Sequence, residues 1–232
     1  LLNIIFEENT IIFFMDTRRK MPNFFFSELK NRKIKIVSID DPLEKRLDCD
    51  LVFYPPVESA YKLNWDGFKG KLFIGWQWIP FRKEFRIINR SLTDNNLVNN
   101  LKEKKDLLIT MGGTDPKNLT KLILNKLDKK ILKIVNLKVL LGDSYLFKDE
   151  LEQLISKKSY DIKIINGTKN ISELMKKSDL AICSFGITAY ELAALNIPSL
   201  HVCLNTDHIY SSALFAKNEM AYCLGDYKIL KS

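Results

Sequence analysis

Two glycine-containing turns in this sequence combine residue types suited to holding a phosphate group. "MGGTDP" begins at Met111 and "CSFGIT" begins at Cys183, and each turn follows an apolar run and precedes a helical stretch. Glycine lets a ligand approach the backbone closely, and the free N–H groups at a helix start favour an anion. An ordinary strand-to-helix connection, in which Asp115 caps its helix, is the better interpretation of the first turn taken alone, and the second turn by itself is also a weak signal.

Glu191 makes the second turn more specific. It lies four residues after Ile187, on the same helix face and about one turn, or ~5.4 Å, from the expected helix start. That separation is close to the span between the phosphates and the ribose of a nucleotide, so its carboxylate could accept hydrogen bonds from both ribose hydroxyls. The alternative is a glutamate stabilised by the helix dipole and partly solvated, which is the better interpretation of Glu191 taken alone.

The other side chains that could act in catalysis or bind a metal are those of two histidines and four cysteines. His201 lies inside the apolar run "SLHVCL", which predicts a packed, hydrogen-bonded core residue. His208 is the better candidate for a substrate contact, with helix capping or a surface role as the alternative. The cysteines lack metal-ligand spacing, so the sequence predicts no metal site. Three of the four lie within or beside apolar runs, which is typical of a reducing cytoplasm.

Strand-like and helical segments alternate regularly through the second half of the chain. From residue 106 the order is strand "DLLITMGG", helix "DPKNLTKLILNKL" with Pro116 near its first turn, strand "LKVLLG", helix "FKDELEQLISKK" and strand "DIKIIN". The next helix is "NISELMKK", which is expected to begin with a capping box of Asn170 and Glu173. It is followed by the strand "DLAICSF", the helix "ITAYELAAL", the strand "SLHVCL" and the helix "DHIYSSALFAKN". This alternation predicts a Rossmann-like α/β domain with a parallel sheet covered on both faces.

The first half contains four further strand-like runs, "TIIFFMD", "KIKIVSIDD", "DLVFYPP" and "KLFIGW". The polar stretch at 81–105 has no sustained apolar stripe and is expected to be a linker. We therefore predict a partial Rossmann-like domain at 1–80 and a ligand-binding Rossmann-like domain at 106–232.

Composition limits the classes of function. The 232 residues are 46% hydrophobic and carry a net charge of +8, with basic and acidic residues interspersed. This pattern favours a globular protein, and nucleic-acid binding is the weakest of the functions considered because no basic run with interleaved aromatic residues occurs. No apolar stretch reaches the ~18 residues of a membrane span.

Residues Ile164 to Ala216 resemble the nucleotide-binding C-terminal domain of GT-B glycosyltransferases, with the peptidoglycan N-acetylglucosaminyltransferase as the nearest pattern. "FIGWQWIPFRKEF" followed by "MGGTDPKNLT" resembles more closely the UDP-sugar hydrolases of pseudaminic acid synthesis and their spore-coat polysaccharide relatives. The resemblance covers roughly residues 10 to 222.

The resemblance implies two Rossmann-like domains with a UDP-sugar bound as substrate and no cofactor. It implies that the turn at Phe185 to Thr188 holds the diphosphate, that Glu191 holds the ribose, and that the backbone near Gly167 pairs with uracil. The implied ligand-binding residues are Gly112, Gly113, Thr114, Asp115, Gly167, Thr168, Ser184, Phe185, Gly186, Ile187, Thr188, Glu191, Asn205, Asp207 and His208.

The sequence departs from this family at the catalytic base. The hydrolases carry it on a histidine in a glycine-rich turn after the first strand, and that segment is not in this chain, so the N-terminal domain is expected to be truncated. Asp16, Arg18 and His208 are the remaining weak candidates for catalysis. The expected function is hydrolysis of a UDP-sugar or transfer of its sugar in surface-polysaccharide or nonulosonic acid synthesis, with poor turnover by this chain. The alternative is an inactive nucleotide-sugar-binding domain of a larger protein.

Overall fold

The computed structural model describes residues 5, 7–85, 104–158, 161–168 and 170–231. The chain divides into two compact units, Leu1–Pro80 and Phe81–Ser232. Most of the predicted linker at 81–105 lies outside the described residues, and Phe81–Phe85 belongs to the second unit.

The first unit contains a four-stranded parallel sheet in the order β1-β2-β3-β4. All four predicted strands are present in it. Its elements are β1 (Ile12–Met15), α2 (Asn23–Asn31), β2 (Lys35–Ile39), β3 (Leu51–Tyr54), α3 (Glu58–Lys62) and β4 (Lys71–Ile74), with short 3-10 helices at Glu44–Asp48 and Trp76–Trp78. Phe26, Leu29, Ile36 and Val52 are almost fully buried between α2 and the sheet.

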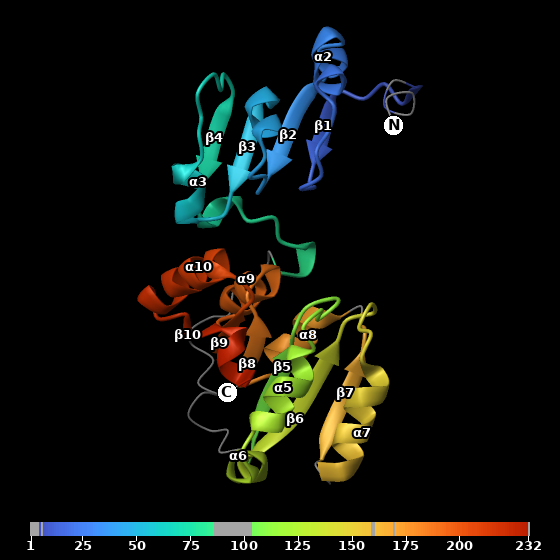
Figure 1. The fold of residues 1–232 in the computed structure, drawn as a ribbon, viewed down its shortest axis with the longest axis vertical. Coiled ribbons are helices and arrows are strands. Elements are labelled where there is room, and N and C mark those ends of the chain that lie inside the picture. The colour runs from blue at the N-terminus through green and yellow to red at the C-terminus, as the bar shows by residue number, and fades with distance from the viewer. Residues whose placement is uncertain (1–4, 6, 86–103, 159–160, 169, 232) are drawn as a thin grey trace. The chain divides into compact units, whose positions relative to one another are not determined.

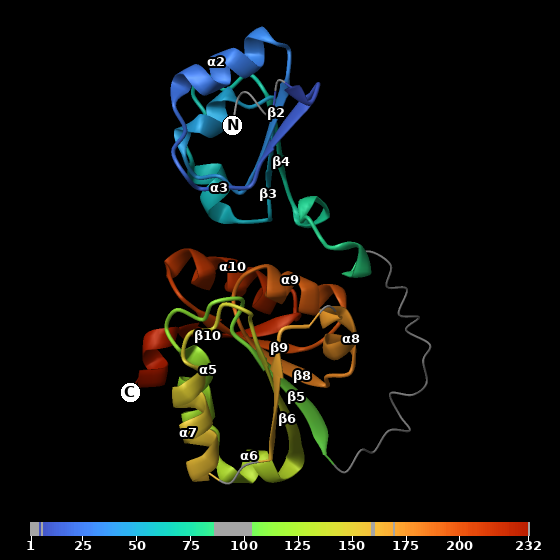
Figure 2. The same ribbon diagram turned by 90° about the vertical axis from the view of Figure 1, so that its right-hand side faces the viewer.

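The second unit contains a six-stranded parallel sheet with helices on both faces (Figures 1 and 2). Its strands are β5 (Lys105–Thr110), β6 (Val135–Leu141), β7 (Ile162–Asn166), β8 (Leu180–Ser184), β9 (Ser199–Cys203) and β10 (Ala221–Asp226). Its helices are α5 (Leu119–Lys126), α6 (Lys129–Ile134), α7 (Lys148–Lys158), α8 (Ile171–Lys176), α9 (Ile187–Ala194) and α10 (Thr206–Lys217), with 3-10 helices at Lys83–Phe85 and Tyr227–Lys231.

The strand order of this sheet is β10-β9-β8-β5-β6-β7. Starting from β5, the strands β6 and β7 follow in sequence on one side of it. The later strands β8, β9 and β10 lie on the other side of β5. This is the doubly wound Rossmann order, and the direction of winding reverses between β5 and β8. The predicted Rossmann-like α/β class with parallel sheets is thereby confirmed.

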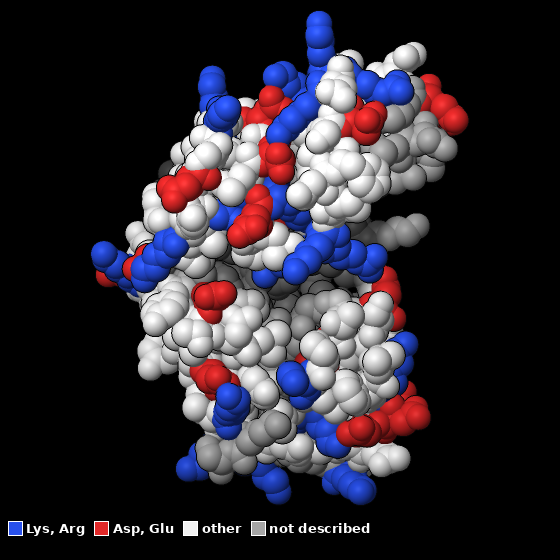
Figure 3. All heavy atoms as spheres, turned by 45° about the horizontal axis from the view of Figure 1, so that its top comes forward, with Lys and Arg blue, Asp and Glu red and all other residues white. Residues whose placement is uncertain are grey.

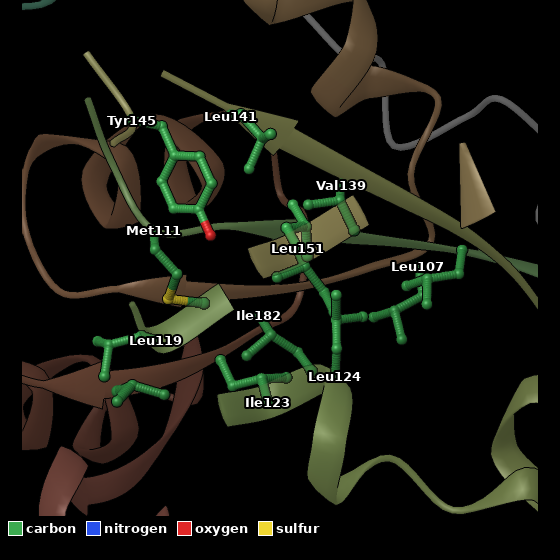
Figure 4. Close-up of a cluster of buried hydrophobic side chains, with 13 residues drawn as sticks. Leu107, Met111, Leu119, Ile123, Leu124, Val139, Leu141, Tyr145, Leu151 and Ile182 are labelled. Atoms are coloured by element: carbon green, nitrogen blue, oxygen red, sulfur yellow. The ribbon is translucent and has the colours of Figure 1, made fainter. Parts of the chain in front are cut away.

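The core of the second unit follows from the alternation of side chains along its strands. Leu107 of β5, Val139 of β6 and Ile182 of β8 point to the same face of the sheet, where they pack against Leu124 of α5 (Figure 4). The intervening positions face the other side, where buried His201 of β9 packs among Phe185, Phe215 and Ser212. Both faces are therefore apolar, as a parallel sheet buried on both sides requires.

Two local predictions differ from the structure, and two elements were not predicted. Pro116 lies before α5 rather than in its first turn, because Asn118 takes a left-handed conformation with φ of 50° and the helix begins at Leu119. The capping box of Asn170 and Glu173 is wrong, since the side chain of Asn170 makes no capping bond and Glu173 pairs with Lys176 at 2.7 Å. The short helix α6 and the strand β10 were not predicted from the sequence.

Basic and acidic side chains are interspersed over the visible surface (Figure 3), as the sequence suggested. Among the described residues, none of the helices has the length and apolar character needed to cross a membrane.

Candidate functional site

The carboxyl ends of β5 and β8 define the most informative edge of the second unit. In an open α/β sheet, ligands bind beyond the carboxyl ends of the strands, at the point where the winding direction reverses. The turn after β5 contains Gly112 and Gly113, and the turn after β8 contains Phe185 and Gly186. Both turns singled out in the sequence therefore lie at the crevice where this fold places its ligands.

These two turns face each other closely. A Cβ atom placed on Gly112 would lie 3.7 Å from the Oγ atom of Ser184, and Gly112 has a φ of +81° that strongly favours glycine. A Cβ atom on Gly113 or Gly186 would meet nothing within 4 Å. The backbone at both positions is thus open to a ligand in this structure.

The turns after β6 and β7 continue the same edge. A Cβ atom on Gly142 would lie 2.1 Å from the carbonyl oxygen of Gly113, so these two backbones are in direct contact. Gly167 has a φ of +56°, and a Cβ atom there would lie 2.1 Å from Oδ1 of Asp143. The structure therefore brings the predicted residues Gly112, Gly113 and Gly167 into one row of turns. Thr168, half-buried beside them, accepts a hydrogen bond from the backbone of Asn170 at 3.1 Å.

The start of α9 presents backbone donors without a side-chain cap. Gly186 is its N-cap residue, has an extended backbone and makes no side-chain capping bond. By contrast, the Asn205 side chain caps α10 by accepting a hydrogen bond from the backbone N–H of His208 at 2.9 Å. An anion at the start of α9 would meet N–H groups and the positive end of the helix dipole.

Asp115 has a structural role in the turn after β5. Its two carboxylate oxygens accept hydrogen bonds from the backbone N–H groups of Leu119 at 2.7 Å and Thr120 at 2.9 Å. The side chain is buried, and this burial raises the pKa of Asp115 above its ordinary value despite those hydrogen bonds. Asp115 therefore shapes the turn by capping α5, while Thr114 beside it is exposed.

Glu191 is buried on α9 with only 4% of its side chain exposed, and it is paired with Arg82. The Arg82 Nε and Nη2 atoms donate to Oε1 of Glu191 at 3.0 and 2.7 Å. Burial raises the pKa of Glu191, and the neighbouring Arg82 guanidinium acts against this rise. The second unit thus already supplies a cation for this carboxylate. Arg82 was not singled out from the sequence, although it lies in the quoted run "FIGWQWIPFRKEF".

His208 lies at the start of α10 and adjoins the turn after β8. Its Nδ1 atom accepts from the backbone N–H of Leu204 at 3.5 Å, and its ring centroid lies 5.7 Å from that of Phe185. Phe185 is buried, so it links the turn after β8 to α10, while Asn205 and Asp207 are exposed. Ile187 is 48% exposed and Thr188 is half-buried at the start of α9.

His201 is a core residue, as predicted. Its side chain is fully buried, and its ring nitrogens lie 2.9 Å from Ser199 Oγ and 3.0 Å from Ser212 Oγ. Burial lowers the pKa of His201 to about 4, so the ring is neutral at pH 7.

Asp16 and Arg18 lie in the first unit, after the carboxyl end of β1. Arg18 forms an exposed ion pair of 2.6 Å with Asp40, which follows β2, and Asp16 is exposed nearby in sequence. Burial raises the pKa of Asp40, and the Arg18 guanidinium opposes this rise. Among the described residues, no group of three or more metal-ligating side chains is gathered in either unit.

Two curated relatives match parts of the chain. An uncharacterized protein of Methanocaldococcus jannaschii is 38% identical over 128 residues, which cover 54% of this chain and 26% of that protein. The spore coat polysaccharide biosynthesis protein SpsG of Bacillus subtilis is 31% identical over 126 residues, which cover 53% of this chain and 37% of that protein. The match thus spans well under two thirds of either relative.

Solved structures of GT-B glycosyltransferase-like proteins share the fold. MurG of Acinetobacter baumannii aligns with a TM-score of 0.59 at 14% identity, covering 99% of this chain and 77% of that one. HepE of Anabaena in complex with UDP aligns with a TM-score of 0.57 at 12% identity, covering 99% and 71%. At these identities the likeness concerns the fold alone.

The family is shown by the second unit itself. Residues 107–232, just over half of the chain, match the model of the glycosyltransferase family 28 C-terminal domain. The match includes both glycine turns, α9 and Glu191. The chain therefore belongs to the family of glycosyltransferase family 28 C-terminal domains.

Proposed function

We propose that the second unit binds a UDP-sugar, and that the protein hydrolyses this sugar nucleotide or transfers its sugar in the synthesis of a surface polysaccharide or nonulosonic acid. The observation that carries the proposal is the uncapped start of α9 at the reversal point of the sheet, with Glu191 one turn further along. HepE, a structural neighbour, was solved with UDP and with UDP-glucose, and SpsG is named for polysaccharide synthesis, which supports the ligand class.

In this proposal the diphosphate lies at the backbone N–H groups around Gly186, and the open backbone of Gly112 and Gly113 faces it. The N–H groups and the helix dipole stabilise the negative charge that grows on UDP as the bond between the sugar and the diphosphate breaks. Water or a sugar hydroxyl attacks the anomeric carbon. The backbone near Gly167 and Thr168 contacts the uracil.

Glu191 would contact the ribose in one of two ways. The ribose hydroxyls donate to the carboxylate oxygen that Arg82 leaves unused, or they displace Arg82 from Oε1. In the first case the ion pair keeps Glu191 charged in a buried place, and a charged carboxylate is the stronger acceptor. In the second case the ribose hydroxyls replace the guanidinium donors at Oε1.

The test is a charge placed at the start of α9. Gly186 has an extended backbone and open space at its Cβ position, so Gly186→Asp is sterically permitted. An aspartate there caps the helix and repels a diphosphate, so we expect native or higher thermal stability together with the loss of UDP binding. Gly186→Ala adds neither a cap nor a charge and is expected to keep UDP binding within a few fold.

Calorimetric titration with UDP, UDP-glucose, ADP and GDP completes the experiment. At a UDP concentration 100 times the dissociation constant of UDP, the free energy of unfolding of the native protein should rise by ~2.7 kcal/mol. The same concentration of ADP or GDP should raise it less. Equal binding of all three nucleoside diphosphates would overturn the uridine assignment, and undiminished UDP binding by Gly186→Asp would overturn the site.

A further inference from the structure

A basic hollow lies at the opposite edge of the second unit, at the amino-terminal ends of β5, β6 and β7. It has a volume of about 530 Å³, and its walls include Lys104, Lys129, Lys133 and Lys163. The helix α6 forms one side of it and lies beside the start of β6 (Figure 1). We call Lys104, Lys129, Lys130, Lys133 and Lys163 the lysine surface.

Among the described residues, the charge of the lysine surface is only partly balanced by its neighbours. Lys138, which also lines the hollow, forms an ion pair with Asp106 at 3.0 Å, so these two charges cancel. Within the described ranges, no ion pair joins the five exposed lysines to a carboxylate. Three aspartates remain nearby: Asp161 in the wall of the hollow, Asp128 at the start of α6, and Asp179, which accepts a hydrogen bond from the backbone N–H of Asp106. In the part of the chain that the structure describes, five lysines against three aspartates make this edge an attractive surface for anions.

The helix α6 adds apolar side chains to the same surface. It has the sequence "KKILKI" and no buried residue. Ile131 and Ile134, three residues apart and hence on one side of the helix, are 40% and 61% exposed. Exposed isoleucines next to lysines are unfavourable in water but suit the boundary between lipid headgroups and acyl chains, where apolar side chains enter and lysines meet phosphates.

We propose that the lysine surface and α6 dock this protein onto an anionic phospholipid bilayer. Nucleic acid fits less well, because none of the described residues that line the hollow is an aromatic residue on which a base would stack. A free phosphate uses the lysines but leaves the isoleucines without a role. The lysines supply the attraction to anionic headgroups, and Ile131 and Ile134 enter the outer part of the acyl layer.

This docking leaves the candidate nucleotide site in water. The lysine surface lies at the amino-terminal ends of the strands, whereas the turns of the candidate site follow their carboxyl ends. A strand of the length of β6, Val135–Leu141, separates the two edges by roughly 20 Å. The site therefore stays accessible to a soluble sugar nucleotide while the protein is bound to the bilayer.

The experiment is co-sedimentation of the full chain with vesicles of phosphatidylglycerol and phosphatidylcholine mixed, or of phosphatidylcholine alone. We expect binding to the anionic vesicles only, weakening as salt is raised. The variant Lys129→Gln/Lys133→Gln/Lys163→Gln should bind on the order of 100-fold more weakly. The matched control Lys148→Gln/Lys217→Gln/Lys228→Gln removes three exposed lysines elsewhere and should bind almost like the native protein.

A second variant separates a bilayer from a simple anion. Ile131→Ser/Ile134→Ser keeps every charge, changes only exposed side chains, and is expected to bind anionic vesicles at least several fold more weakly. Unchanged vesicle binding by this variant would overturn bilayer docking. Bilayer docking would also be overturned if the native protein bound soluble glycerol phosphate as tightly as anionic vesicles. The same holds if a single-stranded RNA competed with the vesicles and bound more tightly than they do. Circular dichroism of each variant verifies that it is folded.

Discussion

The guanidinium group of Arg82 donates two hydrogen bonds to a single oxygen of Glu191, Oε1, at 3.0 and 2.7 Å. This arrangement explains how a helix with a buried face carries a carboxylate in its second turn. It also gives Glu191 two separable roles, because the ion pair fastens Phe81–Phe85 to the second unit and the proposed function adds a contact to ribose. The first two predictions distinguish these roles.

The Glu191→Gln variant tests the ribose contact. If Glu191 accepts hydrogen bonds from both ribose hydroxyls, the loss of ~1.5–3 kcal/mol of charge-assisted bonding weakens UDP binding by roughly 10- to 100-fold. 2′-Deoxy-UDP should bind native protein more weakly than UDP, and should lose less further affinity in the variant because one bond is already absent. Calorimetric titration of both ligands into both proteins measures these differences.

Glu84 provides the matched control for that experiment. Its carboxylate lies 3.6 Å from Nη1 of the same Arg82 but belongs to the short 3-10 helix at Lys83–Phe85 rather than to α9. Glu84→Gln is expected to leave UDP affinity within about twofold. If Glu191→Gln behaves like Glu84→Gln, then Glu191 serves only to hold Arg82.

The Arg82→Gln variant tests the ion pair through its dependence on pH. Burial raises the pKa of Glu191 above 4.5, so the folded state holds the Glu191 proton more tightly than the unfolded state does. The stability from this group is full below pH 4.5 and is lost as the pH rises through the folded pKa. Removing Arg82 raises that pKa further, so the variant should lose about 1–3 kcal/mol at pH 8 and less at pH 5.

Urea unfolding followed by circular dichroism at the two pH values provides the measurement. The double variant Arg82→Gln/Glu191→Gln has no buried carboxylate at this place and should recover most of the loss at pH 8. An equal loss at pH 5 and pH 8 would show that Arg82 acts through packing on Phe85, whose ring centroid lies 5.0 Å from its guanidinium carbon.

Gly142 and Gly113 provide a test of the row of turns. A Cβ atom on Gly142 would meet the Gly113 backbone at 2.1 Å, whereas a Cβ atom on Gly113 would meet nothing within 4 Å. Gly142→Ala should therefore destabilise the protein by about 1–3 kcal/mol and weaken UDP binding by displacing the turn after β5. Gly113→Ala should leave the unfolding temperature within a degree or two. Equal thermal shifts for the two variants would contradict the close contact.

His201 should make the protein sensitive to mild acid. Burial lowers its pKa from 6.5 to about 4, so between these values the unfolded chain binds a proton that the folded state does not. The stabilising contribution is present above pH 6.5 and is lost as the pH falls toward 4, by about 3 kcal/mol in all.

The comparison for this prediction is His201→Gln, which keeps a polar side chain near Ser199 and Ser212 but does not titrate. Its free energy of unfolding should be lower than native at pH 7, and the gap should narrow steadily toward pH 4.5. Asp40, Asp115 and Glu191, whose pKa values are raised, are present in both proteins and cancel in the difference. If the difference in free energy of unfolding between the native protein and His201→Gln stayed constant with pH, His201 would not be the cause of the sensitivity to acid.

Much of the fold could be predicted because each strand of the second unit is a short apolar run between turn residues. β10 was missed because "AYCLGD" is an edge strand with mixed polarity, and Tyr222 on it is 64% exposed. The helix α6 was missed because six residues with no buried side chain leave no apolar stripe in the sequence. Local patterns reveal elements that have a buried apolar stripe, and neither of these two elements contains a fully buried residue.

Site residues could be predicted only where they stand close together in the sequence. The glycine turns and Glu191 stand within short segments, so their spacing along one helix could be read directly. Arg82 lies 109 residues from Glu191, and the contacts between Gly142 and Gly113 and between Asp143 and Gly167 depend on the order of the strands. Such pairings follow from the tertiary fold, which no short segment encodes by itself.

The central position of β5 also determines the order in which this sheet can assemble. During synthesis β5 can pair with β6 as soon as that next strand has been made. The other edge of β5 pairs with β8, which is made much later; there Leu107 lies beside Leu180 and Ile109 beside Ile182. Until β8 arrives, the central strand presents an apolar edge with free backbone hydrogen-bonding groups, which is a template for aggregation. The reversal that creates the candidate site thus delays completion of the sheet, and chains interrupted before β8 are expected to depend on chaperones.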